Sequence, residues 1–125
     1  ANDVGAISPD GQRMLFVRRD EKQLHILSAN TADGGDERLL YSINGEDNIR
    51  DPQFSVDGKT VFFSRRETID GRSRWSLVEI PAVGGAERII LETNGERIGE
   101  LAVLKDGKGI LLNKTDDVSK LNQLY

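Results

Sequence analysis

Short apolar runs, each preceded by turn-forming residues, divide the chain into segments typical of β-strands. Three such runs follow an Asp-Gly pair, at residues 14–17, 61–63 and 110–112. Apolar runs of this length, bounded by turn residues, are typical of buried strands rather than helices. Glycine adopts positive φ without steric penalty and aspartate tolerates it, so each Asp-Gly pair predicts a tight turn between two strands.

The remaining strands are predicted from their positions relative to these turns. One strand precedes each turn, another follows the apolar run, and a fourth completes each of the first two sets. The predicted ranges are 4–8, 51–55 and 100–104 for the first strand, 24–27, 77–80 and 121–124 for the third, and 38–41 and 88–91 for the fourth. No segment has a convincing helical pattern, which favours an all-β fold.

Two markers recur along the chain at nearly the same spacing. The turns are Asp10-Gly11, Asp57-Gly58 and Asp106-Gly107, with aspartates 47 and 49 residues apart (57 − 10 and 106 − 57). The segment 34–40 (GGDERLL) returns 50 residues later as 84–90 (GGAERII). A period of this length with four strands per repeat is typical of a β-propeller blade. We therefore predict two complete blades of four antiparallel strands, 2–48 and 49–97, and an incomplete blade, 98–125.

The segment 51–64 (DPQFSVDGKTVFFS) resembles the repeat signature of TolB-like propellers, in which Pro, an aromatic residue and Ser-Pro-Asp-Gly precede an apolar strand. The first repeat keeps Ser-Pro-Asp-Gly at 8–11, and the third keeps only Asp106-Gly107. The resemblance implies a propeller that holds a protein or peptide partner in the periplasm or another extracytoplasmic compartment of a bacterium. Similar repeats occur in membrane-anchored winged-helix regulators of the CadC-like kind. They also occur in the N-terminal gating propellers of prolyl-oligopeptidase-like serine peptidases, so the resemblance implies no single activity.

A propeller ring normally needs about four to eight blades, more than this chain supplies. We therefore expect the chain to be a fragment of a longer propeller. Unpaired strands and blade edges are templates for another chain, so we also expect self-association.

Composition narrows the classes of partner. The 125 residues are 37% hydrophobic and 30% charged with a mean hydropathy of −0.46, which indicates a folded, soluble chain. The net charge of −4 lacks the basic surplus of nucleic-acid binders, so we expect no nucleic-acid partner. No apolar run reaches the roughly 18 residues that span a bilayer. The chain has no cysteine, which excludes disulfides and thiolate metal ligands.

The sequence contains no recognisable catalytic or cofactor-binding pattern. It has no Gly-x-Ser-x-Gly elbow, Walker-type phosphate loop or Gly-x-Gly-x-x-Gly turn. His25 is the only histidine, and its place in a predicted strand favours a solvent-facing or neighbour-contacting residue over a general base. Acidic residues of the predicted loops lack the spacing of a calcium loop and are interpreted as solvated; they are Asp33, Asp36, Glu46, Asp47, Asp70, Asp116 and Asp117. We predict no enzyme activity, no metal and no cofactor.

One column of the aligned repeats is basic. Arg18, Arg65 and Lys114 coincide at the end of the second strand, and Arg19 and Arg66 follow the first two. This column could form a rim that captures an anionic or peptide partner through arginine forks. Alternatively it is a mixed-charge solvated surface, because acidic residues lie beside every member.

Trp75 is the other candidate for the rim. Tryptophan near a blade edge can anchor a partner, and it can equally pack between blades as ordinary core. The Asp70-Gly71 pair before it predicts a protruding hairpin loop, longer than its counterparts in the other repeats.

Overall fold

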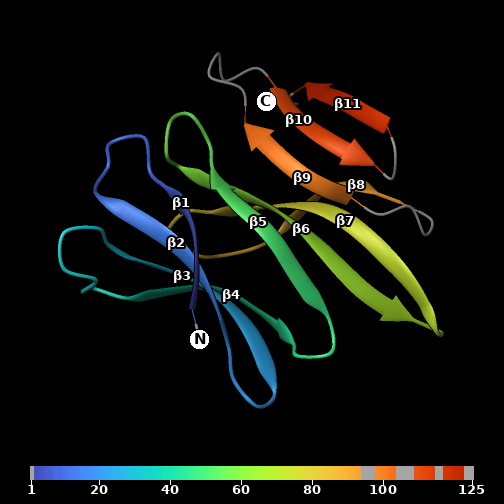
Figure 1. Ribbon diagram of the computed structural model, residues 1–125, viewed down its shortest axis with the longest axis horizontal. Coiled ribbons are helices and arrows are strands. Elements are labelled where there is room, and N and C mark those ends of the chain that lie inside the picture. Colours follow the sequence, from blue (N-terminus) through green and yellow to red (C-terminus); the bar gives the residue numbers. More distant parts are fainter. Residues whose placement is uncertain (1, 94–97, 104–108, 115–116, 123–125) are drawn as a thin grey trace.

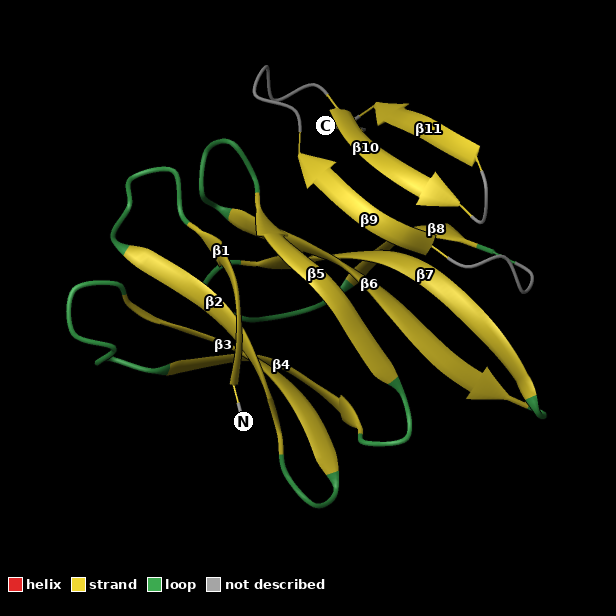
Figure 2. Ribbon diagram, in the orientation of Figure 1, coloured by secondary structure: helices red, strands yellow, loops and turns green. Residues whose placement is uncertain are grey.

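The computed structural model describes residues 2–93, 98–103, 109–114 and 117–122, with side chains at 6–93 and 98. This part of the chain consists of strands, turns and loops, with no helix (Figures 1 and 2). The strands are β1 (Asn2–Ile7), β2 (Arg13–Arg19), β3 (Gln23–Asn30), β4 (Arg38–Asn44), β5 (Asn48–Phe54), β6 (Thr60–Ile69), β7 (Arg72–Pro81), β8 (Arg88–Glu92), β9 (Ile98–Val103), β10 (Gly109–Lys114) and β11 (Asp117–Asn122).

The strands form three antiparallel sheets, each built from strands that are consecutive in sequence. The first sheet has the order β1-β2-β3-β4, the second β5-β6-β7-β8, and the third β9-β10-β11. Strand β5 contacts both β1 and β9, so the first strands of the three sheets adjoin (Figure 1). This arrangement confirms the prediction of an all-β chain with two four-stranded propeller blades and part of a third.

The first two Asp-Gly turns share one hydrogen-bond pattern. The hydroxyl of Ser8 donates to Asp10 Oδ1 (2.6 Å), and the hydroxyl of Ser55 donates to Asp57 Oδ1 (2.7 Å). These bonds, followed by bonds from backbone N–H groups, lower the pKa of both aspartates. Each turn ends on a glycine at φ of 76° or 74°, where a side chain would be strained. The third turn, with Asp106 and Gly107, lies outside the described residues.

Buried side chains cover both faces of the second blade. Phe62 and Phe63 are adjacent in β6 and both fully buried, because successive strand residues point to opposite faces. Phe63 faces the first blade, within a cluster that includes Leu15 and Ile26, while Phe62 faces the third blade and clusters with Ile98. Burial of each such ring contributes roughly 1.5–3 kcal/mol, so the second blade is held from both sides.

Two sequence-based details were wrong. The last strand of the third sheet is Asp117–Asn122, earlier than the predicted 121–124. The long hairpin loop predicted at Asp70-Gly71 is a two-residue turn at these two residues, with φ of 51° and 76°, and residues 72–74 belong to β7. Positive φ at both positions is typical of turns that match the twist of a hairpin, so the protrusion is a regular two-stranded ribbon.

Candidate partner-binding surface

The predicted basic column forms a repeated ion pair in the two complete blades. Arg18 donates to both carboxylate oxygens of Glu37, at 3.2 Å and 2.7 Å. Arg65 donates to Glu87 Oε2 at 2.5 Å. Glu37 and Glu87 occupy the same place in the second repeat marker, 50 residues apart. In both complete blades, the arginine of the basic column therefore contacts the glutamate of the repeated segment (34–40 and 84–90).

Arg65 is buried because the first blade covers it. Its side chain is 7% exposed and lies within reach of the Tyr41 hydroxyl (2.6 Å), Glu87 and Glu67 Oε1 (3.0 Å). Burial acts to lower the pKa of Arg65, but hydrogen bonds to Glu87 and Tyr41 outweigh it and raise this pKa. Burial also raises the pKa of Tyr41 to about 12. Arg65 therefore fastens the second blade to the first, and it presents little surface to a partner.

The other column members have separate environments. Arg19 is exposed and donates to the carbonyl oxygen of Gly45 (2.6 Å), which ties β2 to the loop before β5. Arg66 is half-buried, and its Nε is buried without a hydrogen-bond partner. Lys114 is the last residue of β10, where its backbone is in register with Ile98 and Asp117. The described contacts do not gather these residues into one cluster.

Trp75 lies in the core between the second and third blades. Its side chain is 6% exposed and packs with Phe62, Leu77 and Ile98. The guanidinium of Arg50 lies 6.0 Å from the centre of its ring. The structure therefore places Trp75 among buried residues of the described chain.

His25 has partners that the sequence did not reveal. Its Nδ1 lies 2.7 Å from the Ser42 hydroxyl, and its Nε2 lies 2.7 Å from Asp20 Oδ2. The hydrogen bond to His25, followed by N–H bonds from Lys22 and Gln23, lowers the pKa of Asp20 to about 2. This serine–histidine–aspartate row connects the β2–β3 turn to β4. The cleft described below borders none of the three.

A cleft of about 280 Å³ lies between the first two blades on the side of the Asp-Gly turns. Its walls include Asp10 and Asp57 from these turns, with Arg13, Arg38 and the exposed Val83. Carboxylates and guanidinium groups thus line it together.

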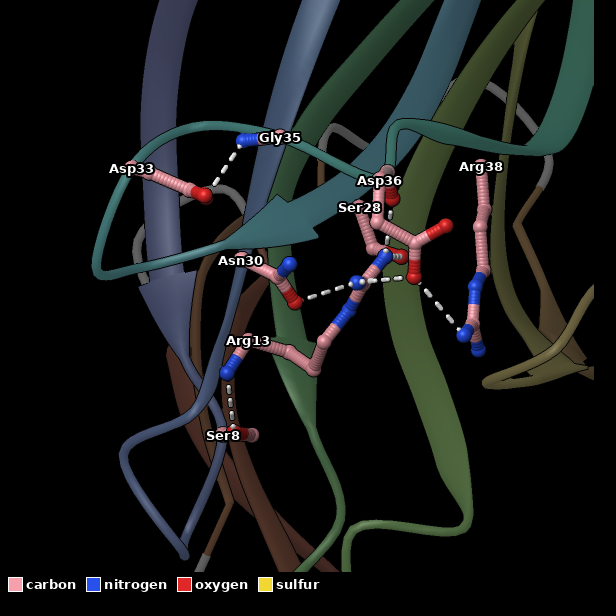
Figure 3. A network of polar contacts seen from close by, with 8 residues as sticks. All are labelled: Ser8, Arg13, Ser28, Asn30, Asp33, Gly35, Asp36 and Arg38. Atoms are coloured by element: carbon pink, nitrogen blue, oxygen red, sulfur yellow. Dashed lines mark hydrogen bonds and ion pairs between the residues drawn. The ribbon is translucent and has the colours of Figure 1, made fainter.

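The arginines of this cleft are engaged within the first blade (Figure 3). Arg13 donates to Asn30 Oδ1 (2.9 Å), the Ser28 hydroxyl (2.7 Å) and Asp36 Oδ2 (3.1 Å). Arg38 donates to the same oxygen of Asp36 at 2.8 Å. The Asp36 carboxylate therefore partly offsets the charge of both arginines, and these contacts connect the loop before β4 to the rest of the first blade.

The β6–β7 ribbon contains two exposed arginines without a polar partner among the described residues. Its register continues for three residue pairs beyond Arg66 and Trp75, whereas the equivalent β2–β3 register ends at Arg19 and Leu24. Arg72 and Arg74 in this extension are exposed and have no hydrogen bond or ion pair with any described residue. Most other described arginines have a polar partner; these are Arg13, Arg18, Arg19, Arg38, Arg65 and Arg88.

The described part of the chain contains neither a metal-binding cluster nor a membrane-spanning helix. Within it, no group of three or more histidine, cysteine, aspartate or glutamate residues is arranged to hold a metal ion. Among the same residues, no helix has the length and apolar character needed to cross a membrane.

The three sheets define the chain as β-propeller blades, and comparison with solved structures specifies the type. The chain is similar to a structure assigned to TolB from Agrobacterium tumefaciens, with a TM-score of 0.76 and 16% identity over 98% of this chain and 46% of that one. For TolB from Acinetobacter baumannii the TM-score is 0.70, with 18% identity over 100% of this chain and 32% of that one. These similarities confirm a TolB-like propeller fold.

An enzyme structure is also similar. A puromycin hydrolase mutant in complex with PGG matches with a TM-score of 0.61 and 18% identity, over 98% of this chain and 22% of that one. The chain thus spans less than half the length of each of these three structures. No protein-family model matches the sequence, and a search of curated proteins also gave no match.

Proposed function

We propose that this chain is a non-catalytic β-propeller module that binds a protein or peptide partner. The observation that carries the proposal is the projecting β6–β7 ribbon, whose Arg72 and Arg74 are exposed and unpaired among the described residues. Unpaired arginine forks on a protruding element are suited to carboxylates of a partner. The proposal includes no cofactor and no nucleic-acid ligand, in keeping with a net charge of −4.

The parent protein in this proposal is a larger TolB-like protein or a membrane-anchored winged-helix regulator of the CadC-like kind. In both cases the propeller would lie in the periplasm or elsewhere outside the cytoplasm of a bacterium. The fold similarity to two TolB structures, with TM-scores of 0.76 and 0.70, supports this parentage. A signal sequence or a transmembrane segment in the full gene would distinguish a secreted protein from a regulator.

The alternative function is the gating propeller of a prolyl-oligopeptidase-like serine peptidase. The similarity to a puromycin hydrolase structure favours it. In that case the blades would admit substrate to a separate hydrolase domain. A nucleophile elbow encoded beyond Tyr125 would support this alternative, and its absence from the full gene would exclude it.

We further propose that the chain self-associates through an uncovered blade face. Ile7 and Leu39 in the first blade are large apolar strand residues that are each 58% exposed, and grouped exposed apolar side chains are typical of interaction surfaces. Size-exclusion chromatography with light scattering over a concentration series tests this. A mass that rises toward the dimer with concentration supports the proposal, and a constant monomer mass contradicts it.

The binding function is tested by selecting ligands for the immobilised chain from a random-sequence peptide library. Selected peptides are then measured by titration calorimetry against the chain in solution. Saturable binding with a stoichiometry near one supports the proposal. Failure to enrich any peptide that binds in solution would contradict it.

A further inference from the structure

The ribbon tip (residues 67–74) continues the β6–β7 pairing three residue pairs further than the equivalent β2–β3 pairing, and Figure 2 shows it at the free end of these two strands. Every residue from Thr68 to Arg74 is exposed, and Ile69 is an apolar side chain 37% exposed. The tip is nevertheless regular, with consecutive cross-strand pairs up to Ile69 and Arg72. It is therefore an ordered projection, able to hold side chains at defined spacing.

The two arginines of the tip lie on one face. Arg72 and Arg74 are separated by one residue in β7, and alternate strand residues point to the same side. The glutamate opposite Arg74, Glu67, forms an ion pair with Arg65 at 3.0 Å. Because the Glu67 carboxylate is paired with the buried Arg65, it offsets little of the charge of Arg72 and Arg74. The face that carries these two arginines is therefore cationic, although the whole chain has a net charge of −4.

No described residue pairs with the β7 edge of the tip beyond Trp75. Strand β8 is in register with β7 only as far as Ser76, and the Thr93 N–H donates to the Trp75 carbonyl oxygen at 2.9 Å. Backbone groups alternate in direction along an antiparallel strand, so the N–H and C=O of Ser73 point to the same edge as that carbonyl. On the opposite edge, the Thr68 N–H donates to Asp47 Oδ1 at 3.3 Å. The Ser73 N–H and C=O of β7 therefore have no partner among the described residues.

We propose that the tip binds an extended acidic peptide segment with carboxylates at alternate positions. This inference deepens the proposed function and rests on it. The segment pairs with the β7 edge at Ser73, and its carboxylates lie beside Arg72 and Arg74. Alternate residues of any extended strand are separated by roughly 6.7 Å, so carboxylates two residues apart match the spacing of the two arginines. Main-chain pairing provides the register, and the arginines select the charge pattern.

The test uses fluorescence anisotropy with the whole chain and two labelled peptides of identical composition, at low ionic strength. One peptide is (Glu-Thr)₄, and the other has four glutamates followed by four threonines. The alternating peptide is expected to bind about fivefold tighter than the block peptide, because it alone can form both exposed ion pairs at once, and two such pairs have roughly this effect on affinity. Equal affinities would contradict the proposal.

Variants separate the contributions of charge and main chain. R72Q/R74Q is expected to weaken the alternating peptide about fivefold or more, while R19Q/R38Q, which removes the same charge elsewhere, leaves its affinity within about twofold. S73P removes the backbone N–H that points to the proposed peptide-binding edge of β7, so it is expected to weaken peptide binding, whereas S73A keeps this N–H and is expected not to. β7 already contains a proline, Pro81, whose backbone points to the same edge as that of Ser73. Unfolding midpoints of all variants verify that each is folded.

Three outcomes overturn the inference. The first is an equal loss of affinity in R72Q/R74Q and R19Q/R38Q. The second is binding of single-stranded DNA of matched charge as tightly as the alternating peptide, which would indicate a general polyanion surface. The third is binding of library-selected peptides with unchanged affinity in R72Q/R74Q and S73P. In that third case the proposed binding function stands and only this site is wrong.

Discussion

Arg18 and Glu37 form an ion pair through two hydrogen bonds in the first blade, and Arg65 and Glu87 form the equivalent ion pair in the second blade through one. The two copies differ in surroundings. The first blade packs over Arg65, whose side chain is 7% exposed, whereas the side chain of Arg18 is 37% exposed. A buried cation that loses its partner is costly, while an exposed one is solvated by water. The two copies thus form a natural comparison.

Replacing Glu87 tests this difference. Glu87→Gln removes the charge opposite the buried Arg65 and is expected to lower the free energy of unfolding by about 1–3 kcal/mol. Glu37→Gln, the repeat-equivalent change at an exposed pair, is expected to have a smaller effect. Urea denaturation of both variants measures this, and equal effects at the two positions would show that burial of Arg65 does not matter.

Alkaline stability depends on Tyr41. Its pKa rises from 10.0 to about 12 on folding because burial disfavours the phenolate. The folded state therefore holds this proton more tightly, and the resulting stability is complete below about pH 10 and is lost as the pH rises toward 12. Unfolding free energies measured from pH 9 to 12 should fall for the wild type and fall less steeply for Tyr41→Phe. Parallel curves would contradict the assignment.

Acid stability depends in part on Asp20. Its pKa falls from 3.8 to about 2 on folding, chiefly through the hydrogen bond with His25. A depressed pKa gives stability that is present above about pH 4 and is lost as the pH falls toward 2. Asp20→Asn should be less stable than the wild type at pH 6, and the difference should narrow between pH 4 and pH 2. A constant difference over this range would exclude the proposed linkage.

Replacing Trp75 tests whether its ring belongs to the core or anchors a partner. Trp75→Ala is expected to lower the free energy of unfolding by about 3–5 kcal/mol, because it leaves a cavity beside Phe62 and Ile98. Thermal unfolding measures the loss, and Arg72→Ala on the same strand serves as the exposed control. A Trp75→Ala variant as stable as that control would show that the ring is not part of the core.

The fold was predictable because its determinants are local. The pairs Asp10-Gly11 and Asp57-Gly58 fix turns through their own backbone and side-chain bonds, and short apolar runs after them define strands. The ribbon was misjudged, since exposed residues such as Arg72 and Ser73 lack the apolar signal that marks a strand. Only the two-residue turn at Asp70 could have indicated that pairing continues beyond the blade.

The candidate site was harder to predict because it depends on which cations are already paired. The aligned sequence showed Arg18 and Arg65 as a column, and it also showed Glu37 and Glu87 at a constant offset, yet nothing local joins the two markers. Contacts such as Arg65 with Tyr41, or His25 with Ser42, connect residues from different strands or blades. Such contacts become visible only when the sheets are assembled.

Native mass spectrometry distinguishes binding without catalysis from cleavage of the bound peptide. The chain is incubated over hours with a peptide selected from the library, and both the complex and the free peptide are weighed at intervals. We expect a one-to-one complex and a peptide of unchanged mass at every time point. A shortened peptide that accumulates with time, or no complex at concentrations that saturate calorimetry, would contradict it.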